Sequence, residues 1–266
     1  MAVTRAFVLL GVLLLAGAAR AVGPTVDVLP NFVGVGAGVT TEWMGSKDRI
    51  AGVAPGARVS FSKHRFAEWY GPTGDVNVLD VPNWEFGPAL SYRFGRSEVT
   101  DPVVSLLPQI GGGWEAGVFA GYNHTSLEGI PWRVRVGVAL LTAVAGDATG
   151  SHVTPFASLW LPLGRTVFLG LGGGFTWSSG SFMQQRFGVA PDASAASGLP
   201  AYSAGADVRQ LYFWPALILQ LSPQWFAGVG GFYQRLSGDA ARSPIVEQRG
   251  DRNQWTAGVG VGYAWR

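Results

Sequence analysis

The sequence of 266 residues has no cysteine and only 14% charged residues. Soluble domains usually carry about 25% charged residues, so part of this protein's surface contacts something other than water. The absence of cysteine excludes a disulfide framework and thiolate chemistry. After Ala21 the chain also lacks an apolar run of about 18 residues, which excludes helical membrane spans in that part. An apolar secreted β-protein and a membrane β-barrel are the classes that remain.

The first 21 residues have the three parts of an export signal. Arg5 provides a positive start, residues 6–17 an apolar core, and Ala19-Arg20-Ala21 a cleavage site. An N-terminal anchor helix is the alternative, but the apolar core is short for a span. We therefore expect a signal peptide over residues 1–21 and a mature chain that begins at Val22.

The charge balance gives no support for a nucleic-acid partner. The chain has 19 Lys and Arg against 17 Asp and Glu, and cleavage would remove Arg5 and Arg20, leaving equal numbers of both signs. Nucleic-acid binding requires a basic face or stripe, and a formally neutral chain gives no support for one. Export without cysteine is consistent with a bacterial periplasmic route.

From Asn31 onward, apolar and polar residues alternate in segments about ten residues long, which is typical of transmembrane β-strands. Residues 254–265 are the clearest example, with Trp255 and Tyr263 on one face and Gln254 on the other. We predict an all-β, antiparallel transmembrane β-barrel over residues 31–266, preceded by a periplasmic segment over residues 22–30. A soluble sandwich has the same periodicity, but the export signal and the aromatic residues near segment ends favour the barrel.

The segments number about twelve, or ten if the irregular pair at 66–70 and 75–79 lies outside the barrel. Outer-membrane barrels have short periplasmic turns and longer outer loops. We therefore place the N-terminus and the short links on the periplasmic rim. The short links are 80–82, 162–164 and 222–224, with 123–129 a longer link on the same rim, and the long links are 95–112, 145–151, 178–204 and 238–251.

Two motifs resemble chemical sites. The glycine repeats at 34–38, 170–174 and 258–262 lie inside strands with no helix after them, so they do not form a dinucleotide-binding loop. They predict small side chains on the lumen face of the barrel. His152 lies close in sequence to Asp147 and Ser151, which leaves an outer-membrane hydrolase as an alternative.

The three histidines are isolated in the sequence, so no metal site is expected. No pattern predicts a cofactor.

Several charged residues occupy the polar positions of the predicted strands and are expected to face the lumen. Opposite charges in such an interior are expected to pair, so we predict an ion-pair network that obstructs the barrel. A selectivity ring in a small pore is the alternative, but a ring usually carries one sign of charge. The residues are Glu42, Arg58, Glu85, Arg93, Glu115, Arg133 and Arg135.

Two of the long links have further features. Asp101–Ile110 breaks the alternation and predicts a short helical turn that ends before Pro108. The link 178–204 is rich in Ala, Ser and Gly, which indicates a segment that is mobile or packed over the mouth of the barrel.

Three stretches are similar to the MltA-interacting protein (MipA)/OmpV family of outer-membrane proteins. They are Phe187–Tyr202 (FGVAPDASAASGLPAY), Tyr233–Val246 (YQRLSGDAARSPIV) and Asn253–Trp265 (NQWTAGVGVGYAW), with weaker matches at 87–96 and 42–48. Barrels of this family usually end on an aromatic residue, whereas here Arg266 follows Trp265.

The resemblance implies a non-enzymatic barrel, in contact with outer-membrane lipid, that links a lytic transglycosylase to a penicillin-binding murein synthase. A small channel, a surface or adhesin-like protein and a hydrolase are the other functions considered. Murein enzymes are periplasmic, so their contacts are expected on residues 22–30 and on the short turns. The candidate turn residues are Asp80, Asn83, Asn123, Glu128, Ser222 and Gln224.

Overall fold

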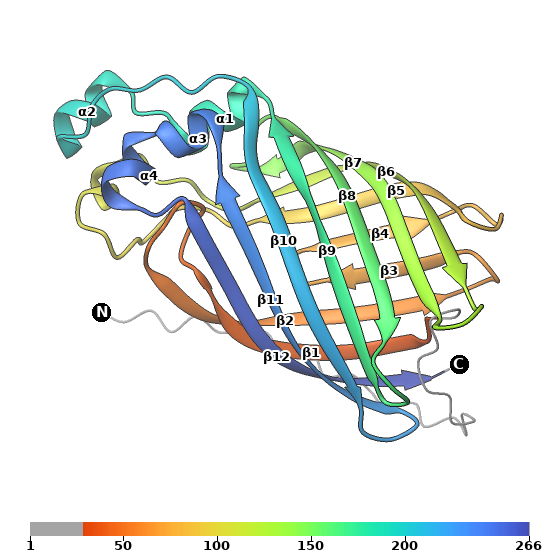
Figure 1. Ribbon diagram of the computed structural model, residues 1–266. Coiled ribbons are helices and arrows are strands. Elements are labelled where there is room, and N and C mark those ends of the chain that lie inside the picture. Colours follow the sequence, from red (N-terminus) through yellow and green to blue (C-terminus); the bar gives the residue numbers. More distant parts are fainter. Residues whose placement is uncertain (1–28, 266) are drawn as a thin grey trace.

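The segments in which apolar and polar residues alternate form twelve strands, and these strands close into one antiparallel barrel (Figure 1). The computed structural model describes residues 29–265, so the predicted signal peptide and most of the N-terminal segment lie outside the described residues. Each strand pairs with its neighbours in sequence, and β1 pairs with β12 to close the barrel. The strands are β1 Asn31–Thr41, β2 Arg49–Ser60, β3 Phe66–Tyr70, β4 Thr73–Asn77, β5 Trp84–Arg93, β6 Gly113–Ser126, β7 Trp132–Gly146, β8 Ser151–Pro162, β9 Val167–Ser178, β10 Asp207–Gln220, β11 Trp225–Leu236 and β12 Asn253–Trp265.

The strands direct their apolar side chains outward and their polar side chains into the lumen. In β12, Gln254 is 2% exposed and its neighbour Trp255 is 52% exposed. In β5, Glu85 is buried between the exposed Trp84 and Phe86. A sandwich would bury this apolar face against a second sheet, whereas here it forms the outside of a closed barrel. The predicted fold class is confirmed.

Aromatic pairs mark both ends of the barrel. At one end Trp84 packs edge-on against Tyr122, with 5.1 Å between the ring centroids. At the other end of the same two strands, Tyr92 packs against Trp114 at the same centroid distance. Trp225 with Tyr263 and Tyr233 with Trp255 repeat this arrangement on the last two strands. Two aromatic girdles of this kind are typical of barrels that cross a bilayer.

The least regular predicted strand pair belongs to the barrel, so the count of twelve is confirmed and ten is wrong. The second strand of the pair is Thr73–Asn77 and not 75–79. The hydrogen bonds of the Asn77 side chain account for the end of β4 at this residue. The Asn77 side-chain amide donates to the backbone carbonyls of His64 and Leu79, and its oxygen accepts from the backbone N–H groups of Leu79 and Phe86. Beyond Asn77 these side-chain bonds take the place of a regular ladder, together with one backbone bond from the Val78 N–H to the Phe86 carbonyl.

All the long links lie on one rim, which also carries the two tight links 71–72 and 147–150. The short-turn rim carries links 61–65, 78–83, 127–131, 163–166 and 221–224, together with the start of β1 and the end of β12. The long-loop rim carries links 42–48, 71–72, 94–112, 147–150, 179–206 and 237–252. The prediction of a long link over 145–151 is wrong, because β7 extends to Gly146 and leaves a tight connection of residues 147–150.

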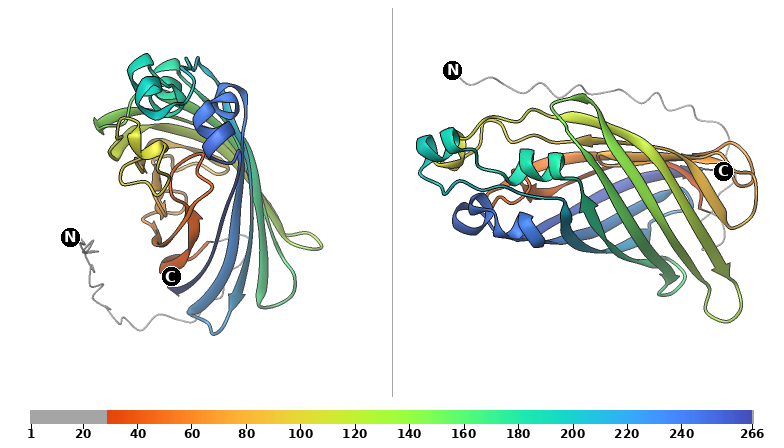
Figure 2. Two further views of the ribbon diagram at one scale, coloured as in Figure 1. Left: turned by 90° about the vertical axis from the view of Figure 1, so that its left-hand side faces the viewer. Right: turned by 90° about the horizontal axis from the view of Figure 1, so that it is seen from above.

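Four helices and a 3-10 turn form a helical cap on the long-loop rim (Figure 2). We use this name for the links 42–48, 94–112, 179–206 and 237–252. None of the helices described between residues 29 and 265 is long and apolar enough to cross a bilayer. They are η1 Val104–Leu106, α1 Gly180–Phe187, α2 Pro191–Ser197, α3 Gly238–Arg242 and α4 Pro244–Arg249.

The helical cap has its own hydrophobic core. One cluster joins Trp43, Val104 and Ile245 from three different links. A second cluster joins Phe182 and Phe187 of α1 to Leu236, Ala240 and Val246. The 3-10 turn η1 confirms the helical turn predicted after Asp101, and link 179–206 is packed on the barrel mouth.

Candidate functional site in the barrel lumen

Six charged side chains meet in the lumen and form what we call the balanced network. Arg58 Nη1 donates to Glu68 Oε2 at 2.6 Å, and Arg135 Nη1 donates to Glu68 Oε1 at 2.9 Å. Arg135 Nε also donates to Glu85 Oε2 at 2.5 Å. Arg133 lies 3.7 Å from Glu85 Oε1, and Asp75 lies 3.7 Å from Arg135 Nη2. Three guanidinium groups therefore face three carboxylates, all from strands β2, β3, β4, β5 and β7.

Aromatic rings pack around this network. The Arg135 guanidinium lies 5.5 Å from the centroid of Phe119 and 5.4 Å from that of Phe156. Arg58 lies over Phe66, with 3.7 Å to the ring centroid. Cation–π contacts of this kind hold the guanidinium groups in place and leave less room for water.

A second group of charges lies next to the helical cap. Arg93 and Glu115 form a bidentate ion pair, with Nε–Oε1 at 2.9 Å and Nη2–Oε2 at 2.6 Å. His152 Nδ1 lies 3.6 Å from Glu115 Oε1. Phe182 of α1 packs edge-on against the His152 ring. The helical cap thus reaches down to the charged side chains of the barrel.

Glu42 does not join either group, unlike the other lumen charges expected from the sequence. Strand β1 ends at Thr41, so Glu42 lies in the link 42–48. Its carboxylate accepts hydrogen bonds from the backbone N–H and the hydroxyl of Thr100, and it ties two links of the helical cap together. The placement of Glu42 in the lumen is wrong because alternation stops one residue earlier.

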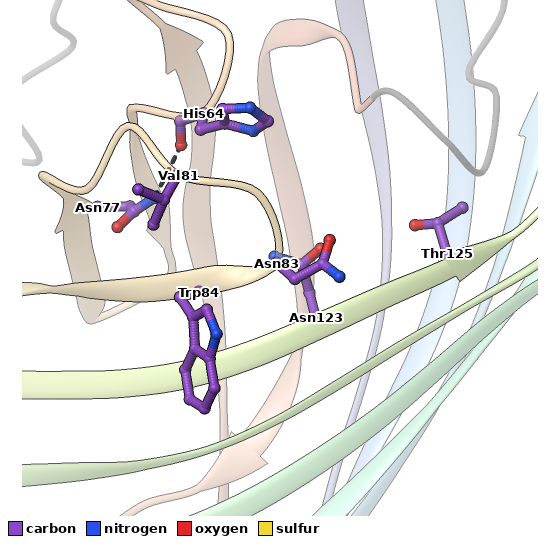
Figure 3. Close-up of a pocket in the computed structure, with 7 residues that line it drawn as sticks. All are labelled: His64, Asn77, Val81, Asn83, Trp84, Asn123 and Thr125. Carbon is purple, nitrogen blue, oxygen red and sulfur yellow. Dashed lines mark hydrogen bonds between the residues drawn. The ribbon is translucent and has the colours of Figure 1, made fainter.

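A pocket of about 210 Å³ opens at the short-turn rim (Figure 3). Asn83 and Asn123 lie next to each other there, because the Asn123 N–H donates to the Asn83 carbonyl at 2.7 Å. Asn83 adopts a left-handed backbone conformation with φ of 68°, which asparagine tolerates better than most residues. The pocket is lined by His64, Asn77, Val81, Asn83, Trp84, Asn123 and Thr125.

Five of the six residues expected to contact a periplasmic partner lie in links of the short-turn rim. The predicted link 123–129 is wrong, because β6 extends to Ser126 and Asn123 lies in this strand, where its side chain donates to Glu85. Asp80 accepts hydrogen bonds from the Ser62 hydroxyl and the His64 N–H; the Ser62 bond, the larger effect, holds the pKa of Asp80 below its usual range. Asn83 and Asn123 line the pocket, and Glu128 is exposed in the link 127–131. The Ser222 hydroxyl accepts from the Trp225 N–H, and the Gln224 carbonyl accepts from the Ala264 N–H.

Ser151, His152 and Asp147 do not form a catalytic triad. The Ser151 hydroxyl donates to Thr142, and the Asp147 carboxylate accepts from the Gly111 N–H. His152 faces Arg93 and Glu115 inside the lumen. Within residues 29–265, no group of three His, Cys, Asp or Glu side chains is placed to hold a metal ion.

A family model for the MltA-interacting protein MipA matches residues 33–265, which is nearly the whole chain. The chain belongs to the MltA-interacting protein (MipA) family. Together with the closed barrel, this membership makes it an outer-membrane barrel protein. None of the curated proteins matches the sequence.

Several solved structures are similar to this MipA-family barrel. The translocator domain of the autotransporter NalP from Neisseria meningitidis has 12% identity and a TM-score of 0.44, with 90% of each chain covered. The NanC porin has 7% identity and a TM-score of 0.44, with 88% of this chain and 99% of that chain covered. The outer-membrane channel DcaP of Acinetobacter baumannii has 8% identity and a TM-score of 0.37, with coverages of 89% and 96%. With TM-scores below 0.5, none of them indicates a function for this family member.

A buried ion pair fastens the helical cap of this MipA-family barrel. Arg249 of α4 donates three hydrogen bonds to the Asp101 carboxylate, at 2.8 to 3.1 Å. The backbone N–H groups of Val103 and Val104 donate to the same carboxylate. Burial alone would raise the pKa of Asp101, but these hydrogen bonds outweigh it and hold the pKa below its ordinary value near 3.8. The ion pair joins the link 94–112 to the link 237–252.

Replacing Asp101 with asparagine is expected to loosen the helical cap. The change removes the charge that Arg249 contacts, at a cost of about 1 to 3 kcal/mol to the folded cap. We expect faster protease cleavage in the links 94–112 and 237–252. Asp192→Asn, at an exposed position of α2, is the matched control.

The same contact predicts a pH dependence. Because the pKa of Asp101 in the folded protein is lowered, its stabilising effect is complete above pH 3.8 and is lost as the pH falls through the lowered value. Pepsin cleavage of the cap is therefore expected to accelerate in that range in the unmutated protein and to change less in Asp101→Asn. Equal acceleration in both proteins would contradict this assignment.

Proposed function

We propose that this MipA-family barrel is a non-enzymatic scaffold in the outer membrane of a Gram-negative bacterium. Its partners would be a lytic transglycosylase and a penicillin-binding murein synthase in the periplasm. The family description names an interaction with MltA, a lytic transglycosylase, which supports a partner of this class. Function at the surface, and not in the lumen, is the central part of the proposal.

The observation that carries the proposal is the balanced network. Arg135 bridges Glu68 of β3 and Glu85 of β5 from its position on β7, so ion-paired side chains link strands around the lumen. Glu85 and Glu68 are almost fully buried, and the network contains equal numbers of both charges. A pore would need an open path through the lumen, which paired side chains from several strands obstruct. The network favours a closed lumen that acts as a rigid support.

The short-turn rim offers surface for a partner. Leu127 is 61% exposed and Ile130 is 73% exposed in the link between β6 and β7, on either side of Glu128. The pocket lined by Asn83 and Asn123 lies on the same rim. A stable interface buries roughly 1,200 Å² or more, which single turns are too small to supply. We therefore propose that several turns bind the partner together.

Photo-crosslinking in intact envelopes tests this proposal. Crosslinkers at Asn83, Glu128 and Gln224 are expected to capture a transglycosylase or a murein synthase. Ala195 is exposed on α2 of the helical cap and is the matched control position, from which no capture of these enzymes is expected.

The positions that give crosslinks would also distinguish the scaffold from a surface or adhesin-like protein and from a small channel. Capture only from Ala195 and other cap positions would place the partner surface on the long-loop rim and favour a surface or adhesin-like role. Failure at all positions, together with a stable ion-selective conductance, would favour a small channel.

A further inference from the structure

Four arginine side chains meet where the barrel contacts the helical cap, and we call them the arginine cluster. Arg93 of β5 and Arg209 of β10 both contact the Phe182 ring, at 4.9 and 4.6 Å from its centroid. Arg186 is four residues after Phe182 on α1, so both side chains lie on one face of this helix. Arg96 Nη1 donates to the Arg186 carbonyl at 3.0 Å, and Arg186 Nη1 donates to the Phe94 carbonyl at 2.7 Å.

The arginine cluster has one carboxylate for four guanidinium groups. That carboxylate is Glu115, and both of its oxygens accept hydrogen bonds from Arg93. Among residues 29–265, no carboxylate forms an ion pair with Arg96, Arg186 or Arg209. These three residues are only 4 to 6% exposed. The cluster therefore differs from the balanced network, where each guanidinium has a carboxylate.

Several donors of the arginine cluster are buried without a partner. They are Nε of Arg96, Nε and Nη2 of Arg186, and Nε of Arg209. A buried charge without a counter-ion costs several kcal/mol, and a buried donor without an acceptor adds to that cost. Nε of Arg58 and Nη2 of Arg135 in the balanced network also have no acceptor, but each arginine there has a carboxylate as its counter-ion, which Arg96, Arg186 and Arg209 do not have. An anion from solution is the group that would complete the cluster.

We propose that Arg96, Arg186 and Arg209 bind a small oxyanion, such as inorganic phosphate or sulfate, beneath the helical cap. Guanidinium groups present paired N–H donors that match the spacing of oxyanion oxygens. The anion would accept hydrogen bonds from the buried donors of Arg96, Arg186 and Arg209 that have no other partner.

The two arginines outside the strands retain their charge at neutral pH. Burial lowers the pKa of Arg96 to about 10. Burial, followed by the nearby charges of Arg93 and Arg96, lowers the pKa of Arg186 to about 10. Both groups are therefore protonated near pH 7, and repulsion between them is relieved when an anion binds.

Calorimetric titration with inorganic phosphate tests this site. The full mature chain is refolded in a neutral detergent without lipopolysaccharide, so that no lipid phosphate competes, and sodium chloride at equal ionic strength is the reference. We expect saturable phosphate binding that chloride does not reproduce. Arg186→Gln is expected to weaken it by about tenfold or more, because a charge-assisted hydrogen bond is lost.

Arg242→Gln is the matched control, since Arg242 lies on the same rim with an exposed side chain that pairs with Asp239. It is expected to leave phosphate binding unchanged. If Arg186→Gln does not fold, Arg96→Gln and Arg209→Lys test the same prediction. The proposal is overturned if phosphate acts no differently from chloride, if only a phosphorylated lipid binds, or if Arg242→Gln weakens binding as much as the cluster variants.

Discussion

Replacing Gly38 with alanine is expected to destabilise the closed barrel and to lower the fraction of the protein that folds. Gly38 lies on β1 opposite Gly258 of β12, at the seam where the first and last strands meet. A Cβ atom at Gly38 would lie 2.4 Å from the Ala257 carbonyl oxygen and 2.9 Å from Gly258 Cα. Both are backbone atoms, which cannot move away without breaking the ladder that closes the barrel. The expected cost is about 3 kcal/mol or more, at the upper end of overpacking effects.

The fraction of folded protein is measured from the unheated band on a detergent gel, whose mobility differs from that of the heated band. Gly52→Ala is the matched control, because Gly52 pairs with Gly38 from the other side and a Cβ atom there meets nothing within 4 Å. Gly52→Ala is expected to fold as well as the unmutated protein. Equal folding of Gly38→Ala and Gly52→Ala would show that close approach at the seam is not what requires glycine.

The sequence was sufficient to predict the long strands and their inward charges. Side-chain direction in a strand depends only on the period of two, so Arg133 and Arg135 could be assigned to the lumen without knowing their partners. Glu68 was missed because its strand spans only Phe66–Tyr70, which is too short for alternation to identify it.

Arg209 was missed for a different reason. The ladder between β9 and β10 shifts its register between Val208 and Gln210, and this irregularity leaves the adjacent residues Arg209 and Gln210 both buried. In a regular strand, successive side chains point to opposite faces, so either Arg209 or Gln210 would face outward. A shift of this kind depends on the neighbouring strand, and a single sequence does not reveal it.

The helical cap was the least predictable part. Its helices are five to eight residues long, shorter than the windows in which helical periodicity becomes visible. Their apolar residues pack against those of other links, as Ile245 does with Trp43 and Val104, so no single segment shows a complete core. The packing of the cap therefore depends on contacts between residues that lie far apart in the sequence.

Replacing Arg135 with alanine is expected to destabilise the barrel by about 3 to 5 kcal/mol, as removal of one partner from a buried ion pair does. Arg135 is the residue that contacts both Glu68 and Glu85, and its side chain is 19% exposed. Glu85 would retain Asn123 and the more distant Arg133, and Glu68 would retain Arg58. Denaturant unfolding in detergent measures the loss. Arg135→Lys preserves the charge and is expected to lose less, and Arg165→Ala, in an exposed turn, is expected to lose almost nothing.

The same residues determine whether the lumen conducts. If the balanced network obstructs the barrel, the unmutated protein in a planar bilayer is expected to show little or no steady conductance. Replacing Arg133 and Arg135 together with alanine removes two side chains that cross the lumen and leaves Glu68, Glu85 and Asp75 with Arg58 as their remaining arginine in the network. We expect this variant to conduct, because two side chains that obstruct the lumen at the balanced network are gone. A large, stable, ion-selective conductance from the unmutated protein would instead show that ions pass the network, and the scaffold proposal would lose its main support.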